Sequence, residues 1–347
     1  MTQLFTCWTA EVGAADAARA GGKAAALGEL ARAGLPVPRG FVITTAAFVS
    51  HMDGVDPDGA ARGALGALGA DDLAGIARAA AALRAQVVAQ ALPPEVASEI
   101  ASAAAALDDG PVAVRSSATL EDSAEASFAG LQDTYLAVRG TDAVLDRVRA
   151  CWASLYNDES ITYRRRQGTG EDGLAMGVVV QPMLDPRSAG VMFTRSPVTG
   201  DRSVVAIEGT WGLGSALVGG EVTPDSFTVS KVTGEITGRR VGVKLRVHSF
   251  TPNGQGISAT PMAVSLRETP CLTDDEVRAL ARLGQQVEDH YGVPQDIEWA
   301  LLGASPSRFA LLQSRPETVW AARDRGPIAS PQAKASDHVL TRFSRGL

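Results

Sequence analysis

The hydrophobic pattern of this chain changes near residue 174, and the change limits the folds that the chain can adopt. Residues 59–106 are rich in alanine, with leucines at helical intervals, which indicates helices packed closely together. From residue 174 onward, apolar runs such as LAMGVVVQPML and SAGVMF alternate with turn signals such as DPRS and PVTGD. That alternation predicts a sheet-rich second half. The sequence therefore predicts an α+β fold.

The length of the chain, 347 residues, is too great for one ordinary hydrophobic core. We expect an N-terminal lobe over residues 1–179, with the alanine-rich helices inside it, and a C-terminal lobe over residues 180–320. After Trp320 the composition turns to Arg, Pro, Ser, Ala and Gln, so residues 321–347 are expected to form a tail or linker. Hydrophobic residues make up 45% of the sequence, which argues against wholesale disorder.

Charge and composition exclude several classes of function. The net charge of −7 argues against nucleic acid as a partner, and the densest basic cluster, RRR at 164–166, is typical of a solvated helix face. No run approaches about 18 apolar residues, and the opening MTQLFTCWTAEVG lacks the features of a signal peptide, so no membrane contact is expected. The cysteines are far apart and form no CxxC pair, which favours reduced thiols in a cytoplasmic protein.

The segment PQDIEWALLGASPSRFALLQSRPETVW (294–320) predicts a β-hairpin with unusual polar side chains. Glu298 lies on its first strand, and Gln313 and Arg315 share a face of the returning strand. A turn centred near Ser305 would bring Glu298 within one residue of Gln313. Two oxygen ligands beside a cation suit an Mg²⁺ ion that also contacts phosphate. A surface hairpin with a cross-strand Glu–Arg pair is the alternative interpretation.

Two basic residues of the N-terminal half are candidates for binding phosphate. Lys23 lies in GGKAAALG, where a glycine turn enters a helix whose free N–H groups favour anions, although the segment does not match GxxxxGK[ST]. Arg115 follows the apolar strand PVAV and precedes the hydroxyl-rich SSAT, which suits a phosphate clamp. A structural salt bridge from Arg115 to Glu121 or Asp122 is equally compatible with the pattern.

Five long segments occur in an order that is typical of one family. They are GGKAAALGELARAGLPVPRGFVIT, RSSATLEDSAEASFAGLQDTYLAV, VVVQPMLDPRSAGVMFTRSPVTGD, GLGSALVGGEVTPDSF and PQDIEWAL…FALLQSRPETVW. The chain closely resembles the ATP-binding domain of the dikinase family, which includes phosphoenolpyruvate synthase, pyruvate phosphate dikinase and rifampin phosphotransferase. The resemblance runs from about residue 12 to residue 318. It implies an ATP-grasp fold, in which two lobes clamp ATP between them.

The resemblance also implies roles for the charged residues. Lys23 and Arg115 would hold the nucleotide phosphates, and Arg315 would contact the transferring phosphoryl group, so these three are the expected catalytic residues. Glu298 and Gln313 would ligate Mg²⁺. ATP and Mg²⁺ are therefore the expected ligands.

Further positions are expected to surround the nucleotide. The loop that ends at Gly130 would close over the phosphates, with Thr134 nearby. Glu208 fits the position for the ribose hydroxyls. The segment that connects the lobes would meet adenine, where backbone groups can read its edge, and it includes Gln181, Met183 and Leu184.

The sequence departs from the family pattern in two places. GLGS places Ser215 where the family usually has a glutamate, which puts one polar contact in doubt. Family members also continue into a swivelling domain whose histidine, usually in a Thr-Ser-His-type motif, accepts phosphate from ATP. The histidines of this chain lie outside such a motif, and they are His51, His248, His290 and His338.

These observations favour one function and leave two others open. The leading hypothesis is an ATP-binding subunit of a split dikinase-type enzyme. It would phosphorylate a histidine on a partner protein for transfer to a small acceptor, with AMP and phosphate as co-products. A self-contained ATP-grasp kinase or ligase acting on a small molecule or peptide is the first alternative. The second is a non-catalytic nucleotide-binding regulatory module. The chain being a piece of a larger enzyme would equally explain the missing histidine domain.

Overall fold

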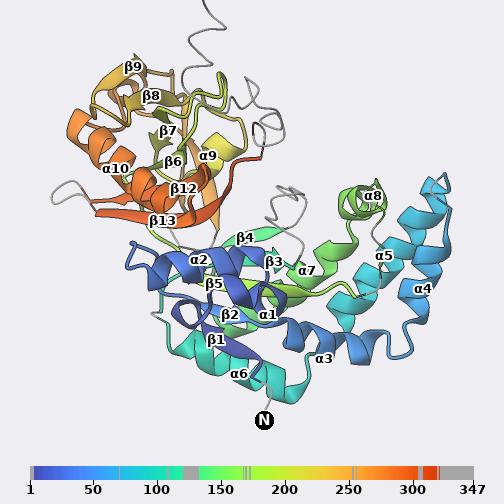
Figure 1. Cartoon of the computed structure of the whole chain (residues 1–347). Helices are drawn as coiled ribbons and strands as arrows, with labels where there is room; N and C mark the ends of the chain where they lie inside the picture. Colours follow the sequence, from blue (N-terminus) through green and yellow to red (C-terminus); the bar gives the residue numbers. More distant parts are fainter. Residues whose placement is uncertain are drawn as a thin grey trace, which may run out of the picture.

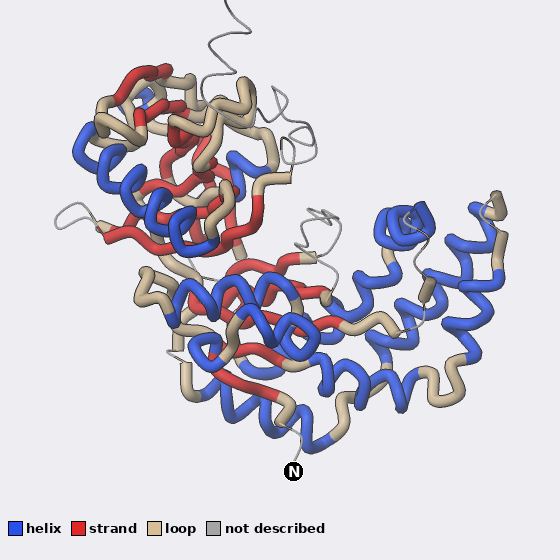
Figure 2. Tube along the Cα trace, in the orientation of Figure 1, coloured by secondary structure: helices blue, strands red, loops and turns tan. Residues whose placement is uncertain are grey.

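Two antiparallel sheets, each with its own hydrophobic core, organise the chain (Figure 1). The structure is a computed structural model, and it describes residues 4–69, 71–107, 109–119, 133–166, 168, 170–171, 173–251, 254, 256–303, 308–318 and 320. Helices dominate the first half of the chain and strands dominate the second, as Figure 2 shows. The predicted mixture of helix and sheet is confirmed. The expected tail, 321–347, lies outside the described residues.

The first sheet has five strands in the order β1-β2-β5-β3-β4. Their bounds are β1 Thr6–Trp8, β2 Phe41–Ile43, β5 Met176–Pro182, β3 Val112–Ala118 and β4 Thr134–Val138. Both faces of the sheet are covered. Neighbouring residues of β5 point to opposite faces, and each face packs into a different hydrophobic core. Val178 and Val180 of β5 pack with the helices that follow β2, whereas Val179 packs with the helices that precede it.

The helices of the first half form two groups. The first group lies on the Val179 face and contains α1 (Ala17–Ala20) and α2 (Gly22–Arg32). The second group builds the larger core around Trp152 and Phe48, whose rings meet edge to face at 5.9 Å. It consists of α3 Thr45–Val55, α4 Ala60–Ala67, α5 Leu73–Ala89, α6 Pro94–Ala105, α7 Thr141–Ala153 and α8 Asp158–Arg166. Short 3-10 turns complete this half at η1 Thr9–Glu11, η2 Ala14–Asp16 and η3 Ser154–Tyr156.

The second sheet has six strands in the order β13-β12-β6-β7-β8-β9. Their bounds are β13 Arg308–Pro316, β12 Gln295–Leu302, β6 Ser188–Phe193, β7 Val204–Trp211, β8 Asp225–Ser230 and β9 Ile236–Arg240. One face carries Ile297, Met192 and Ile207, which pack with Leu280 of α10 (Asp274–Tyr291). The second lobe also contains α9 Ser215–Val218, η4 Val264–Leu266 and the hairpin of β10 Arg246–Phe250 and β11 Ile257–Pro261.

The two halves contact each other along α2 and β13. Leu30 of α2 is fully buried in the core of the second lobe, together with Leu311 of β13. The backbone N–H of Leu311 donates to the carbonyl of Pro36 at 2.8 Å, just after α2. In Figure 1, α2 lies directly beneath β13. The chain itself crosses between the halves after Pro182, the last residue of β5.

No helix in the described part of the chain is both long enough and apolar enough to cross a bilayer.

Candidate functional site

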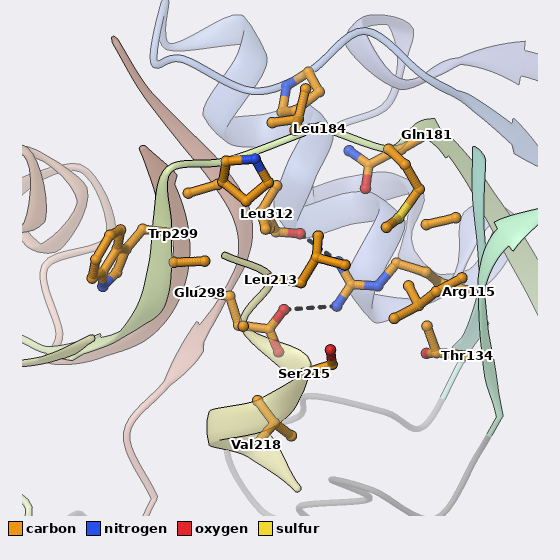
Figure 3. A pocket seen from close by; sticks show the side chains of 18 of the residues that line it. Arg115, Thr134, Gln181, Leu184, Leu213, Ser215, Val218, Glu298, Trp299 and Leu312 are labelled. Atoms are coloured by element: carbon orange, nitrogen blue, oxygen red, sulfur yellow. Dashed lines mark hydrogen bonds and ion pairs between the residues drawn. The ribbon is translucent and has the colours of Figure 1, made fainter. Parts of the chain in front are cut away.

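A cavity of about 310 Å³ lies between the two sheets. The first lobe contributes side chains from β3, β4 and β5, and the second contributes side chains from β6, α9, β12 and β13. The segment after β5 closes one end with Met183, Leu184 and Pro186. The lining is mostly apolar; Arg115, Glu298 and Ser215 gather on one side, whereas Gln181 lies toward Leu184 (Figure 3). Such a cavity suits a small ligand with one apolar and one charged end.

Arg115 is the central charged group of this cavity, and it joins the two lobes. Its Nη2 donates to Glu298 Oε2 at 2.9 Å and to Gln313 Oε1 at 2.7 Å, and its Nη1 donates to the carbonyl of Leu312 at 2.7 Å. The side chain of Arg115 is only 12% exposed. The salt bridge to Glu121 or Asp122 that the sequence left open falls outside the described residues. The guanidinium instead binds the two predicted metal ligands.

Strand alternation places Arg115 in the cavity. Val114 and Ser116, its neighbours on β3, are fully buried, while Arg115 points away from that core toward the second lobe. Thr134 is paired with Arg115 across β3 and β4, and it lines the same cavity. Gln181 of β5 is paired with Ala113, two residues before Arg115, and therefore shares the face. Three predicted site residues are thus brought together by register.

Glu298 and Gln313 are direct cross-strand partners on β12 and β13. A simple hairpin would offset them by one residue, but a bulge between Glu298 and Trp299 shifts the register and sets them opposite each other. The predicted proximity is confirmed, and the bulge supplies its physical reason. Both side chains lie on the face of the sheet opposite the α10 core, which is the face that meets the first lobe.

The donor set at Glu298 and Gln313 fits a hard divalent ion, because carboxylate and amide oxygens are ligands that Mg²⁺ accepts. Among the described residues, no cluster of three or more His, Cys, Asp or Glu side chains has the spacing of a metal site. Glu298 and Gln313 each offer one side-chain oxygen donor at this point, and water and phosphate would complete the shell of an ion bound there. In the structure, Nη2 of Arg115 donates to both oxygens, so the positive charge of the guanidinium lies at the position proposed for the ion.

Lys23 is buried against β3 and does not line the cavity. Its Nζ donates to the carbonyl of Ser116 at 2.7 Å, and the residue is 5% exposed. The close approach of α2 to β3 depends on Gly21, whose φ is +83° and whose Cβ, if present, would lie 1.8 Å from the carbonyl oxygen of Ser117. The Ser117 hydroxyl in turn accepts from the N–H of Ala24 at 3.0 Å. Lys23 is therefore held one strand position away from Arg115.

Gln181 presents an unsatisfied donor to the cavity. Its Nε2 is buried and has no hydrogen-bond partner among the described residues. A buried amide without a partner is costly, and a ligand with an acceptor would satisfy it. Met183 and Leu184 also line this end, but the N–H of Met183 already donates to the carbonyl of Pro111 at 2.8 Å. The donor available to a ligand is therefore the side-chain amide of Gln181 and not the backbone N–H of Met183.

Arg315 forms an ion pair with Asp296 on the facing strand. Its Nη2 lies 2.6 Å from Asp296 Oδ2, and the pair is separate from the cavity lining. Burial raises the pKa of Asp296, and the Arg315 charge partly offsets that effect. Asp296 was not among the predicted site residues, although it shares the strand face of Glu298 two positions away, a signal that the sequence already contained.

Glu208 lies on the cleft face of the second sheet, in register with Glu298 through Val191 of β6. It is half-buried and does not line the cavity. Gly130 lies outside the described residues. The cavity thus gathers six predicted residues, Arg115, Thr134, Gln181, Met183, Leu184 and Glu298, with Gln313 attached through Arg115.

Ser215 lines the cavity and belongs to a cluster that the sequence did not reveal. Its hydroxyl lies 2.9 Å from Nδ1 of His248, and Nε2 of His248 lies 3.2 Å from Glu221 Oε2. His248 lies 33 positions after Ser215 and 27 positions after Glu221, so no short sequence motif contains the cluster.

Comparison with known proteins shows the family to which the chain belongs. Residues 17–336 match the family described as "Pyruvate phosphate dikinase, AMP/ATP-binding domain". The chain is 44% identical over 311 residues to a rifampicin phosphotransferase of Streptomyces sp, with 89% of this chain and 35% of that protein covered. It is 37% identical over 369 residues to a probable phosphoenolpyruvate synthase of Staphylothermus marinus, with coverage of 98% and 44%.

A probable phosphoenolpyruvate synthase of Methanothermobacter thermautotrophicus is 41% identical over 320 residues, with coverage of 90% and 46%. The chain thus spans less than half the length of each of these relatives. The match to the family covers most of the chain and includes both lobes and the cavity between them. This chain belongs to the family of pyruvate phosphate dikinase AMP/ATP-binding domains.

Proposed function

We propose that this chain binds Mg²⁺-ATP in the cavity between its lobes, in the manner of an ATP-grasp fold, and that it acts as an ATP-dependent phosphotransferase. The observation that carries the proposal is the bridge from Arg115 to Glu298 and Gln313 across the cleft. It places one cation and two oxygen ligands from opposite lobes at the same point. A triphosphate with its metal needs that combination of charges.

The adenine would occupy the end of the cavity formed by Met183 and Leu184. Apolar side chains there suit the faces of a purine ring, and the free Nε2 of Gln181 suits one of its ring nitrogens. The ribose would then extend along the cleft face of the second sheet toward Glu208. In this arrangement the phosphates would reach the Arg115 end of the cavity.

Phosphoryl transfer depends mainly on positioning and on charge neutralisation. Arg115 and Lys23 would bind phosphate oxygens from the first lobe. Glu298 and Gln313 would hold Mg²⁺, which when bound neutralises further charge on the phosphates. Arg115 donates to Glu298 and Gln313, so binding of a metal ion by these two residues would compete with the guanidinium and free it for a phosphate. Arg315 would contact the transferring group after giving up part of its pairing with Asp296.

We further propose that the phosphate acceptor is a histidine on a partner protein, as in a split dikinase-type enzyme. The chain spans less than half the length of each of these relatives, which leaves room for such a domain outside it. The partner would pass the phosphate to a small acceptor, with AMP and phosphate as co-products. Thr134 and the loop that ends at Gly130 would cover the phosphates on the first-lobe side.

The test combines the chain, Mg²⁺-ATP labelled at the β-phosphate, and a candidate partner that carries a Thr-Ser-His-type motif. We expect AMP and an acid-labile label on the partner, both lost in Glu298→Gln. The exposed Glu235→Gln is the matched control and should retain both. ADP formation with a small acceptor and no partner would refute the split enzyme in favour of a self-contained kinase. Nucleotide binding without turnover under any condition would point instead to a regulatory module.

A further inference from the structure

A serine, a histidine and a glutamate form a hydrogen-bonded chain in the wall of the cavity. Ser215 lines the cavity, and its Oγ lies 2.9 Å from Nδ1 of His248. The other ring nitrogen, Nε2, lies 3.2 Å from Oε2 of Glu221. The side chain of His248 is 12% exposed and that of Glu221 is 42% exposed, so the chain runs from the cavity outward to solvent.

The backbone fixes this arrangement. The N–H of Leu213 donates to the carbonyl of His248 at 2.9 Å, which ties the turn before Ser215 to β10. Gly212 has a φ of +70°, and a Cβ there would lie 2.5 Å from the same carbonyl oxygen, so only glycine permits the contact. On the other side, the N–H of Glu221 donates to the carbonyl of Ala216 at 3.0 Å. The three side chains are held by the fold rather than by chance contact.

The hydrogen bonds define the proton positions when His248 is neutral. Glu221 can only accept, so Nε2 of His248 carries the hydrogen and Nδ1 is the acceptor. The Ser215 hydroxyl then donates to Nδ1, and the lone pairs of its oxygen remain available to the cavity. A hydroxyl beside a base that a third group orients is the arrangement that activates serine as a nucleophile.

The position of Ser215 places this hydroxyl with the charged groups of the cavity. Figure 3 shows Ser215 on the same side as the Glu298 carboxylate and the Arg115 guanidinium, and away from Gln181 and Leu184. The nucleotide arrangement proposed above puts the phosphates at that end. In that arrangement, Ser215 would face the reacting phosphate rather than the adenine.

We propose that Ser215 is a phosphate acceptor within this chain, with His248 as its general base and Glu221 as the residue that orients His248. The inference rests on the proposed binding of ATP in this cavity, and it adds an acceptor that the split-enzyme function does not need. The Ser215 oxygen forms a bond to the γ-phosphorus of ATP, and the bond from that phosphorus to the β–γ bridging oxygen breaks. ADP leaves with the bonding electrons, and the Ser215 proton passes to Nδ1 of His248. The product is phosphoserine at position 215.

The test incubates the full chain with Mg²⁺-ATP labelled at the γ-phosphate, in the absence of any partner. We expect an acid-stable, base-labile label that peptide mapping places at Ser215, with one ADP released for each phosphate incorporated. Acid stability separates this product from a phosphohistidine. Ser215→Ala should lose the label, and His248→Asn should slow labelling by about 100-fold or more.

The chain offers a matched control at His290. This histidine also lies 3.2 Å from a glutamate, Glu29 Oε1, but it is on α10 and does not line the cavity. His290→Asn should therefore label at the rate of the unsubstituted chain. Nucleotide affinity, measured on every variant by calorimetry, shows whether each substitution has left the cleft intact.

Three outcomes would overturn the inference. ATP binding with no acid-stable label would refute Ser215 as an acceptor and leave the proposed function standing. Unchanged labelling in His248→Asn, with nucleotide affinity retained, would refute the role of the base. Failure of the chain to bind ATP at all would refute the inference and the proposed function together.

Discussion

Replacement of Arg115 by methionine should strengthen the binding of a divalent metal ion and weaken the binding of ATP. In the structure, one nitrogen of Arg115 donates to both Glu298 and Gln313, so a metal ion that binds these oxygens would compete with the guanidinium. Arg115→Met removes that competitor and should tighten binding of Mn²⁺, a probe for Mg²⁺, when no nucleotide is present. The same substitution removes a cation from the phosphates and should weaken ATP binding.

The size of the first effect follows from the contacts that the ion must break. A hydrogen bond to a charged group is worth about 1.5–3 kcal/mol when buried, and an exposed ion pair is worth about 0–1 kcal/mol. The Arg115 side chain is 12% exposed and that of Glu298 is 32% exposed, which lies between these cases. We therefore expect a gain of about 1–2 kcal/mol, or about 5- to 30-fold in the dissociation constant.

The measurement is titration with Mn²⁺, with free ion followed by electron paramagnetic resonance, and the control is Arg139→Met. Arg139 also reaches from the first lobe to the second, where its Nε donates to the carbonyl of Gly254 at 2.7 Å, but it does not touch the metal ligands. Arg139→Met should leave Mn²⁺ affinity unchanged. Equal tightening in both variants would mean that looser lobes, not a vacated site, cause the effect. No change in Arg115→Met would refute the competition altogether.

Three further predictions concern stability, each checked by the free energy of unfolding in denaturant. Lys244 and Asp225 form a fully buried ion pair at 2.5 Å, and Lys244→Met should cost about 3–5 kcal/mol because it strands the carboxylate. Thr273 accepts from a backbone N–H as the N-cap of α10, and Thr273→Ala should cost about 1 kcal/mol. The N–H of Ala14 lowers the pKa of Glu29 below its usual 4.5. The stabilisation by Glu29 is then complete above that pH and is lost as pH falls through the folded pKa, so Glu29→Gln should flatten the acid limb of the stability profile. A cost near zero for Lys244→Met, a Thr273→Ala variant as stable as the parent, or an unchanged acid limb would each contradict the corresponding argument.

The sequence predicted the hairpin and its polar face, since alternation along a strand is a local property. It also indicated that Glu298 and Gln313 are neighbours, but their direct pairing depends on the bulge at Trp299, which no residue pattern announces. The sequence favours phosphate as the ligand of Arg115, which stays a prediction, but it does not show that Arg115 contacts Gln313, 198 positions away. Contacts of that span depend on how the two sheets meet, and this information is absent from any short window of sequence.

The cluster of Ser215, His248 and Glu221 is a second case in which a short window of sequence does not reveal a contact. The sequence shows Ser215 only as a departure from the family pattern and His248 only as a histidine outside a motif. Their contact arises because a glycine turn is tied to β10 by a backbone hydrogen bond. Neither residue type nor spacing encodes that pairing, so only the folded arrangement shows that the two positions belong together.

The insertion of Leu30 into the core of the opposite lobe has a mechanical consequence. The apolar side of α2 packs against both lobes. Sliding either lobe along this helix would expose Leu30 to water, which is unfavourable. We therefore expect the lobes to separate by a swing about α2, with the greatest travel at the rim farthest from it. Entry and release of a nucleotide would displace the groups at that rim most. Lys23 lies on α2 itself and would move little.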